Sequence, residues 1–144
     1  DASAQPFDPG LATRVLGVSP HAYSNSTTFI DALRTIDPEA TGLYAHNAYD
    51  CLNIIALAAI AAGSTVPAEI AAQIPAVTAS GTTCNSFPEC AEALSAGRNV
   101  NYEGPSGNLS INTSGEMTSA VFDRFTFDEN GRDDSTGTIR IGDG

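Results

Sequence analysis

Basic residues are scarce in this sequence. Six Lys and Arg stand against 17 Asp and Glu, which gives the 144-residue chain a formal net charge of -11 at pH 7. Nucleic acids and anionic membrane surfaces attract patches of Lys and Arg, and this chain has too few to form one. The composition therefore excludes both as expected partners. The acidity favours solubility in an exposed compartment, and the length is enough for one ordinary domain with its own core.

Motifs of catalysis and metal binding are also missing. The sequence has no GxSxG elbow, no HExxH and no Walker motif, and no nucleophile stands next to a base. The two histidines, His21 and His46, have no metal-ligand spacing to each other or to the cysteines. We therefore expect a protein that is not an enzyme and that uses no metal and no other cofactor.

No apolar run reaches the length of about 20 residues that a membrane span needs. The opening residues, DASAQPFDPG, lack the charged and apolar regions of a signal peptide, and we expect them to form a loop. We see no internal repeat and no heptad pattern. We therefore expect the sequence to be a processed or excised piece of a longer chain.

The three cysteines differ in their surroundings. Cys51 lies in an apolar stretch, where we expect a buried free thiol. Cys84 and Cys90 are separated by only five residues in TTCNSFPEC. We expect a disulfide between them, which would close a small loop and stabilise the fold by about 2–3 kcal/mol. The alternative is a zinc site, which would need two further ligands. The disulfide would indicate an oxidising, extracytoplasmic compartment.

Residues 44–63, YAHNAYDCLNIIALAAIAAG, predict a central helix. Its second half is apolar apart from Asn53, and Gly63 suits a helix end because glycine takes the left-handed conformation without strain. A helix that is apolar nearly all round must be covered by other elements. We therefore expect a buried helix whose polar first turns, residues 44–50, lie at an edge of the domain.

The remaining pattern predicts helices first and strands later. Residues 76–87 and 99–107 are expected to be loops. A buried strand is expected at 13–18, followed by a helix from about 24–26 to 37. After the central helix we expect a helix capped by Ser64 or Thr65 that runs from 67 to 74 and stops at Pro75, and a helix at 86–96 that a Ser86/Glu89 capping box begins. The expected strands of the last part are 108–112, 120–127 and 138–141, with a hairpin turn at 128–131. This order lacks the regular βαβ alternation of a doubly wound domain, so the chain resembles part of a larger α/β architecture.

Four stretches resemble the C-terminal third of the type I periplasmic solute-binding proteins, the branched-chain amino-acid receptor family of ABC importers. They are LGVSPHAYSNSTTFIDAL, AYDCLNIIALAAIAAGSTVPAEIAAQI, NVNYEGPSGNLSINTSGEM and AVFDRFTFDENG. The second resembles the family pattern "aYDAv…lA.Ai..AGs.d…ia.al", and the third resembles "i.Y.G.sG.i.fd..Gd". Together they cover about residues 10–132 in the family's order. Two departures are Cys51 in place of a small Ala and Asn112 in place of an acidic residue.

The resemblance implies an α/β fold that forms the C-terminal part of a two-lobed architecture, with helices packed on sheets and a C-terminal β-hairpin. It assigns residues 1–38 to the second lobe, 39–118 to the first lobe, and 119–144 to the closing strand and hairpin of the second. A chain of this length would lack most of both lobes. We therefore expect a fragment, with the remaining segments of both lobes as partners.

In that family the ligand lies in the cleft between the lobes. The resemblance places an aromatic residue facing the cleft at Tyr44. His46 and Asn47 share its polar turn, where backbone N–H groups are free donors. Tyr49 and Asp50 follow, in positions that are more often structural. The candidate ligand-binding residues are Tyr44, His46, Asn47, Tyr49 and Asp50, with His21 and Tyr23 from the loop after the first strand.

The glycine-rich loop at residues 104–107 resembles phosphate-binding loops only in composition. It lacks a lysine, and we expect a turn that connects the lobes. The functional expectation is an extracytoplasmic protein, periplasmic or a cell-surface lipoprotein, that captures a small polar solute such as an amino acid for an ABC permease. Two alternatives remain open: a ligand-sensing domain of a membrane signalling receptor, and a non-enzymatic secreted interaction domain.

Overall fold

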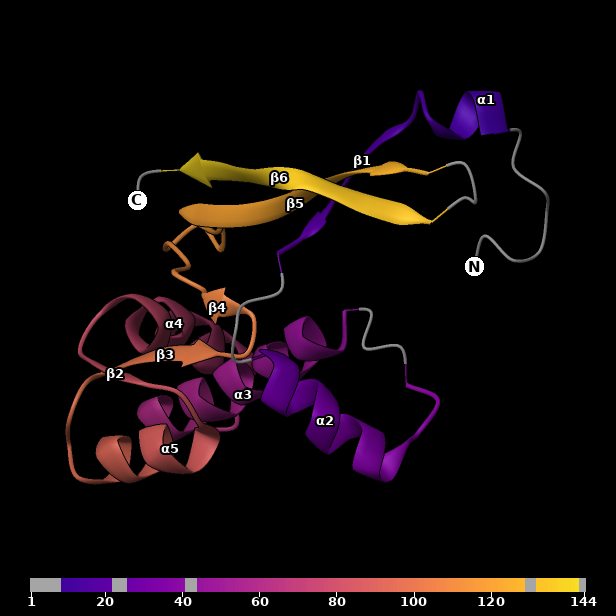
Figure 1. Ribbon diagram of the computed structural model, residues 1–144. Coiled ribbons are helices and arrows are strands. Elements are labelled where there is room, and N and C mark those ends of the chain that lie inside the picture. The colour runs from indigo at the N-terminus through magenta and orange to yellow at the C-terminus, as the bar shows by residue number, and fades with distance from the viewer. Residues whose placement is uncertain (1–8, 22–25, 41–43, 129–131, 143–144) are drawn as a thin grey trace. The chain divides into compact units, whose positions relative to one another are not determined.

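A computed structural model describes residues 9–21, 26–40, 44–128 and 132–142. The chain is a mixed α/β protein with two small sheets and a C-terminal hairpin (Figure 1). It divides into two compact units. The sheet unit consists of Asp1–His21 and Val121–Ile141, and the helical unit consists of Ala22–Ala120 and Gly142–Gly144.

The sheet unit contains one turn of helix and three strands. These are α1 (Pro9–Ala12), β1 (Leu16–Pro20), β5 (Ser119–Phe127) and β6 (Asp133–Gly142), with the strands in the order β1-β5-β6. β1 runs antiparallel to β5, in a register that places Gly17 opposite Phe125. The ring of Phe125 lies across Gly17 and leaves no room there for a Cβ atom. The predicted closing strand and return strand are both present, and residues 129–131 of the predicted turn lie outside the described residues.

The prediction of a buried strand at residues 13–18 was wrong. β1 starts only at Leu16, and the side chains of Leu16 and Val18 are 62% and 59% exposed. All ten residues of β6 are exposed as well. The physical reason is that the described part of this unit provides one sheet and no second layer to cover it.

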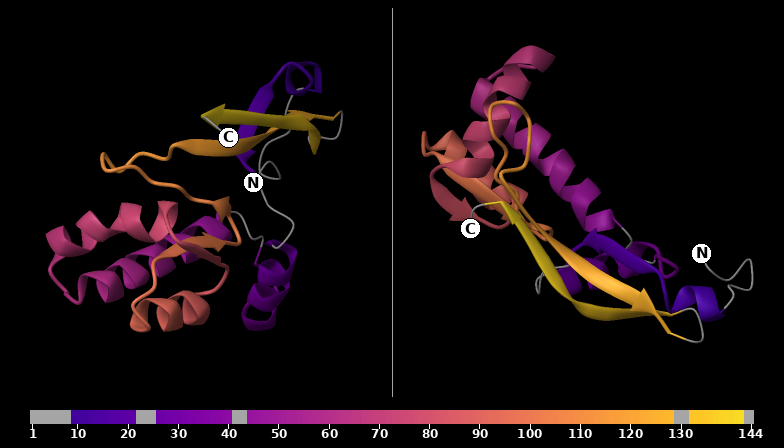
Figure 2. Two further views of the ribbon diagram at one scale, coloured as in Figure 1. Left: turned by 90° about the vertical axis from the view of Figure 1, so that its left-hand side faces the viewer. Right: turned by 90° about the horizontal axis from the view of Figure 1, so that it is seen from above.

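The helical unit contains four helices and a small sheet among its described residues. Its elements are α2 (Ser26–Ile36), α3 (Ala45–Ala62), α4 (Pro67–Ala79), β2 (Thr82–Cys84), α5 (Phe87–Ser95), β3 (Val100–Gly104) and β4 (Gly107–Asn108). β3 lies between its two partners, parallel to β2 and antiparallel to β4. The helices α3, α4 and α5 pack around this sheet (Figure 2).

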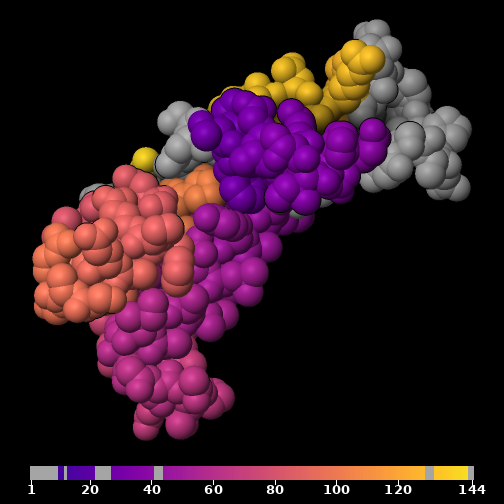
Figure 3. Space-filling view, turned by 90° about the horizontal axis from the view of Figure 1, so that it is seen from below, coloured from indigo at the N-terminus to yellow at the C-terminus, as the bar shows by residue number. Residues whose placement is uncertain are grey.

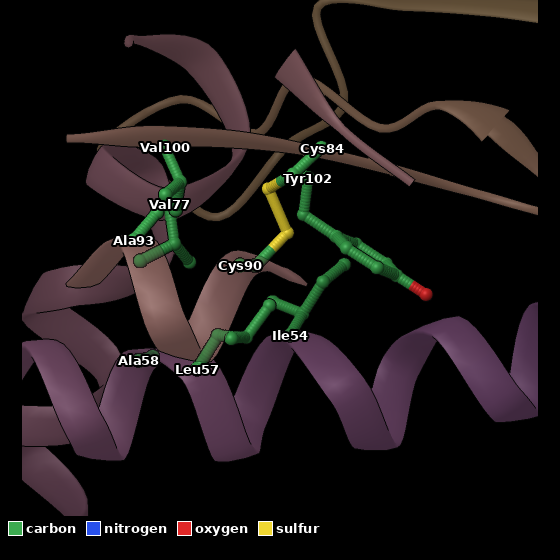
Figure 4. Close-up of a cluster of buried hydrophobic side chains, with 9 residues drawn as sticks. All are labelled: Ile54, Leu57, Ala58, Val77, Cys84, Cys90, Ala93, Val100 and Tyr102. Atoms are coloured by element: carbon green, nitrogen blue, oxygen red, sulfur yellow. A yellow bond between two sulfur atoms is a disulfide. The ribbon is translucent and has the colours of Figure 1, made fainter. Parts of the chain in front are cut away.

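The core of the helical unit lies between α3 and β3. Figure 4 shows its buried side chains, which are Ile54, Leu57, Ala58, Val77, Cys84, Cys90, Ala93, Val100 and Tyr102. Full burial of a Val, Leu or Ile side chain contributes about 1.5–3 kcal/mol. The predicted disulfide between Cys84 and Cys90 is present within this core, and it joins β2 to the first turn of α5. The zinc alternative for these two cysteines is therefore not needed.

The central helix is confirmed, and its ends follow the predicted chemistry. Gly63 ends α3 in the left-handed conformation, with φ 58°. The N–H groups of Gly63 and Ser64 donate to the carbonyl oxygens of Ile60 and Ala59, at 3.1 and 3.3 Å. These hydrogen bonds satisfy carbonyl groups that the helix itself leaves free.

The prediction that α3 is covered all round was wrong. Cys51 is a free thiol and is exposed, and the neighbouring Leu52 and Ile55 are 69% and 44% exposed. Figure 3 shows the magenta residues of α3 uncovered at the surface beside the salmon residues of α5. α4, α5 and β3 cover only one side of α3, and α2 contacts it at its N-terminal end.

α4 begins at Pro67 as predicted, but its capping residue and its C-terminal end differ from the prediction. Val66 precedes its first turn, and Ser64 contributes by accepting a hydrogen bond from the Val66 N–H at 3.1 Å. The helix continues through Pro75 to Ala79. Proline removes one helical hydrogen bond, a cost of about 3 kcal/mol. We attribute the continuation to burial of the last turn, where Val77 and Thr78 are completely enclosed.

Two predicted loops contain strands. β2 lies within residues 76–87, and β3 lies within residues 99–107. β3 alternates buried and half-buried positions, in step with the alternation of apolar and polar residues in Val100, Asn101, Tyr102 and Glu103, which the loop prediction did not take into account. The strand predicted at residues 108–112 is reduced to β4 and one bridge between Ile111 and Met117.

The capping box of α5 is confirmed. The Ser86 hydroxyl accepts a hydrogen bond from the Glu89 N–H at 3.5 Å. The Glu89 carboxylate in turn accepts from the Asn85 N–H at 3.0 Å. Two donors at the start of the helix are thereby satisfied, which fixes where α5 begins.

Candidate functional site

A buried carboxylate lies in the second turn of α3. The Asp50 side chain is only 1% exposed. It accepts hydrogen bonds from the Tyr102 hydroxyl at 2.7 Å and from the Ser106 backbone N–H at 2.7 Å. The Ser106 hydroxyl donates a third, short hydrogen bond to the same carboxylate. A buried charge is tolerated only when such donors replace the water it has lost.

Tyr102 extends this group of hydrogen bonds towards Asn53. The Asn53 side-chain amide donates to the Tyr102 hydroxyl oxygen at 2.8 Å, and that hydroxyl donates onward to Asp50. Burial raises the pKa of the Tyr102 hydroxyl far above its ordinary value, and the nearby Asp50 carboxylate raises it further, whereas the Asn53 amide lowers it. Tyr102 therefore stays neutral and keeps the proton that it donates. We call Asp50, Asn53, Tyr102 and Ser106 the Asp50 network.

Gly104 is required by the close approach of this network. A Cβ atom at Gly104 would collide with the Asp50 carboxylate and the Tyr102 hydroxyl. The loop that follows forms the turn between β3 and β4, and it directs Ser106 at Asp50. Glycine thus lets backbone and carboxylate meet without an intervening side chain. The Asp50 network joins α3 to the β3–β4 turn across more than 50 residues of sequence.

The start of α3 has a different character. Tyr44 precedes the helix in the left-handed conformation, with φ 56°, and its side chain is 53% exposed and makes no capping hydrogen bond. It is the one non-glycine residue with positive φ among the described residues. A left-handed conformation costs a non-glycine residue about 1–2 kcal/mol. The backbone N–H groups of the first helical turn have no acceptor within the helix.

Two polar atoms in the same turn have no hydrogen-bond partner within the part of the chain that the structure describes. Nε2 of His46 and the side-chain oxygen of Asn47 are both buried and unpaired, and the His46 residue is only 8% exposed. A buried polar atom without a partner costs about 1–3 kcal/mol and calls for an explanation. We call residues 44–47 the polar start of α3.

The structure brings five of the candidate ligand-binding residues into the first two turns of α3 or next to them. These are Tyr44, His46, Asn47, Tyr49 and Asp50. Tyr49 is 40% exposed, and its ring packs against Phe29 of α2 with ring centroids 5.1 Å apart. Tyr49 therefore links α2 to α3, and Asp50 links α3 to the β3–β4 turn.

The other two candidates belong to the chain segment before α2. His21 lies in the sheet unit, where its Nδ1 atom is 2.7 Å from a carboxylate oxygen of Asp123 on β5. Its backbone N–H donates to the Val121 carbonyl at 3.0 Å. Tyr23 lies outside the described residues. The sequence reading missed Asp123, Tyr102, Ser106 and Asn53. The available signals were the alternation of VNYEG and the paired glycines around Ser106.

A shallow, open hollow lies at the opposite end of α3. Ala59, Ile60, Gly63, Ser64 and Thr65 line it at the junction with α4. An 18-residue helix is about 27 Å long, so this hollow is separate from the polar start of α3. Its described lining offers no ionisable side chain.

The chain matches no protein-family model, no curated protein and no solved structure.

Among the described residues, no group of three or more His, Cys, Asp or Glu side chains is placed to hold a metal ion. No single described helix is long and apolar enough to cross a membrane. α3 and α4 reach that length and composition only as a pair, bent by 106°.

Proposed function

We propose that this chain is the C-terminal part of a two-lobed, type I solute-binding protein. In this proposal it works outside the cytoplasm and captures a small polar solute, such as an amino acid, for an ABC permease. The observation that carries the proposal is the polar start of α3, where an exposed aromatic ring lies beside buried polar groups that have no hydrogen-bond partner among the described residues.

The chemistry of this turn suits an anionic or zwitterionic ligand. The N-terminus of a helix carries a partial positive charge and free N–H donors, and it therefore attracts a carboxylate. The exposed ring of Tyr44 provides an apolar surface next to those donors. The left-handed backbone at Tyr44 is a local strain of the kind often found at binding sites.

Rigid support behind the turn strengthens the proposal. Asp50 is one turn of helix away from His46, and its three donors fix α3 against the β3–β4 turn. The contact between Tyr49 and Phe29 adds a second anchor. A binding turn held in place before the ligand arrives loses less conformational freedom on binding.

The division of the chain also supports a two-lobed protein. β1 and most of the β5–β6 hairpin belong to the sheet unit, and the elements from α2 to β4 that separate them in the sequence belong to the helical unit, so the chain leaves the sheet unit after β1 and returns to it in β5. The exposed face of α3 and the uncovered sheet are surfaces on which the remaining segments of both lobes would pack. The disulfide suits an oxidising compartment. Lobe closure on the solute would shift the population towards the form that the permease binds.

Native mass spectrometry of the full-length protein tests this proposal, followed by calorimetric titration with a panel of amino acids. We expect a retained small molecule or measurable affinity for one class of solute. Tyr44→Ala should weaken that affinity by about tenfold or more, because it removes the aromatic surface. Glu69→Gln, an exposed change on α4, serves as the matched control and should leave the affinity unchanged.

An affinity that is equal in the Tyr44 variant and in the control would remove the polar start of α3 from the site. No measurable affinity for any solute would contradict the solute-binding proposal as a whole. A non-enzymatic secreted interaction domain would then be the better description.

A further inference from the structure

We propose that β6 is a docking edge at which two copies of this chain pair antiparallel and join their sheets. The proposal rests on the described residues of β6 and is independent of solute binding. β6 is ten residues long, stands at the edge of the sheet, and is exposed at every position. An uncovered edge strand of this length, about 33 Å, presents a row of unpaired backbone groups to a partner.

The hairpin geometry shows which backbone groups point outward. The Asp128 N–H donates to the Arg132 carbonyl at 2.8 Å, and Arg124 lies against Thr136 through two side-chain hydrogen bonds at 3.1 and 3.2 Å. In an antiparallel pair the hydrogen-bonded positions alternate. Even-numbered residues of β6 therefore direct their N–H and C=O groups at β5. The outward groups belong to Asp133, Ser135, Gly137, Ile139 and Ile141.

β6 has only part of what normally protects an edge. Protected edge strands are usually short or carry charged side chains, above all Lys, or Pro or a bulge. β6 is long, its charged residues Asp133, Asp134 and Arg140 are of both signs, and its one irregular backbone position before the last residue is Gly137, with φ 131°. The sequence DDSTGTIRIG contains neither Lys nor Pro. The opposite edge of the same sheet, β1, has only five residues and ends in Pro20, which has no N–H to donate. The two edges of one sheet therefore differ in their capacity to accept a strand.

A second copy of β6 is the partner that its own charges favour. When two copies pair antiparallel with Gly137 opposite Gly137, Asp134 of each copy lies opposite Arg140 of the other. The same register pairs Thr136 with Thr138. These are non-hydrogen-bonded positions at the new junction, where side chains approach most closely. Of the registers that the outward groups permit, only this one places Asp134 opposite Arg140. It therefore forms two ion pairs between the copies, which offset part of the repulsion between two chains that each carry a net charge of -11.

The test is sedimentation velocity of the purified protein over a series of concentrations. The native protein should show a reversible monomer–dimer equilibrium. Asp134→Arg and Arg140→Asp should each weaken the dimer by about tenfold or more, because each places two pairs of like charges opposite one another. Both positions are exposed, so circular dichroism should report an unchanged fold.

Mixing the two variants provides the decisive comparison. In a mixed dimer, the arginines at 134 and 140 of one variant lie opposite the aspartates at 140 and 134 of the other. The mixture should therefore recover dimers with an affinity close to or above that of the native protein. Leu52→Gln, on the exposed face of α3, is the control for a dimer formed elsewhere and should leave the affinity unchanged.

Three results would overturn the proposal. They are a native protein that stays monomeric at all concentrations, a dimer that neither charge reversal weakens, and a mixture of the two variants that stays monomeric. Loss of the dimer in Leu52→Gln alone would assign the association to α3 and would equally reject β6.

Discussion

The helical unit and the sheet unit of this chain differ in how they are stabilised. The helical unit encloses a set of apolar side chains, a disulfide and a buried carboxylate with three donors. In the sheet unit, no residue among those described is fully buried. Its aromatic side chains include the edge-to-face pair Phe125 and Phe127, with ring centroids 5.5 Å apart. The helical unit can therefore support itself, whereas the sheet unit leaves apolar surface that needs a cover.

The same comparison separates two kinds of polar contact. Asp50 and Asp123 each contact an aromatic or imidazole side chain at 2.7 Å. Asp50 is enclosed, so the loss of its partners would leave charge or donors buried without compensation. The side chain of Asp123 is 28% exposed, so water can take the place of the carboxylate contact with His21 that a substitution removes. The two contacts have the same length, but we expect them to contribute unequally to the free energy of unfolding.

Replacement of Asp50 should give the largest effect. We expect Asp50→Ala to lower the free energy of unfolding by about 3–5 kcal/mol, because Tyr102 and Ser106 lose their acceptor inside the core. Asp123→Ala, the matched change in the sheet unit, should cost about 1 kcal/mol or less. Urea denaturation of both variants measures the difference. Equal losses would contradict the distinction between the two units.

Removal of the disulfide should come second. Cys84→Ala combined with Cys90→Ala should lower the free energy of unfolding by about 2–4 kcal/mol, since the unfolded chain regains the freedom of the closed loop. Cys51→Ala is the control, and it should change stability by less than about 0.5 kcal/mol because that thiol is exposed. Under denaturing conditions the native protein should show a single free thiol, and a count of three would refute the disulfide.

Filling the space at Gly104 should have a smaller effect. Gly104→Ala should cost about 1–3 kcal/mol, because the added methyl group forces Asp50 and Tyr102 apart. Gly63→Ala supplies the contrast: its Cβ would meet nothing, but its φ of 58° is strained for alanine, which costs about 1 kcal/mol. The losses caused by Gly104→Ala and Asp50→Ala should also be non-additive in the double variant, because both substitutions act on the Asp50 network. Simple additivity in a double-mutant cycle would mean that Gly104 does not act through the Asp50 network.

The smallest expected effect is a dependence on alkaline pH. The pKa of Tyr102 is raised in the folded protein above its ordinary value of 10.0. The stabilisation that the neutral Tyr102 hydroxyl contributes to the folded state is therefore fully present below pH 10.0. As the pH rises past it, the unfolded form loses a proton that the folded form retains, so the free energy of unfolding falls by up to about 1.4 kcal/mol per pH unit. Denaturation between about pH 9 and pH 11 should show a shallower fall in Tyr102→Phe. Identical slopes in the two proteins would contradict the role of Tyr102.

Local chemistry predicted several parts of this fold. Gly63 marked the end of α3, the Ser86 and Glu89 pair marked the start of α5, and the Cys84–Cys90 pairing was deduced from spacing. Each depends on residues within a few positions of one another. Such signals act before any tertiary structure exists, and they can be read from the sequence alone.

Features that depend on distant residues escaped prediction. The partners of Asp50 lie 52 and 56 residues away, and no pattern near Asp50 announces them. Burial of the last turn of α4 overrode the tendency of Pro75 to end a helix. The exposure of Cys51 depends on which elements cover α3. At the candidate site, the sequence indicated Tyr44, His46 and Asn47, whereas the strained backbone and the unpaired buried atoms emerged only from the structure.

Native-state hydrogen exchange in dilute protein tests the contrast between the two units most directly. We expect the amides of Tyr102 in β3 and of Leu57 in α3 to exchange only through global unfolding. The β5-facing amide of Thr138 in β6 should exchange at least about 100-fold faster, through local opening of the sheet unit. Equal protection of Thr138 and Tyr102 would contradict this expectation, because it would show one cooperative unit in place of a stable helical unit and a weakly held sheet.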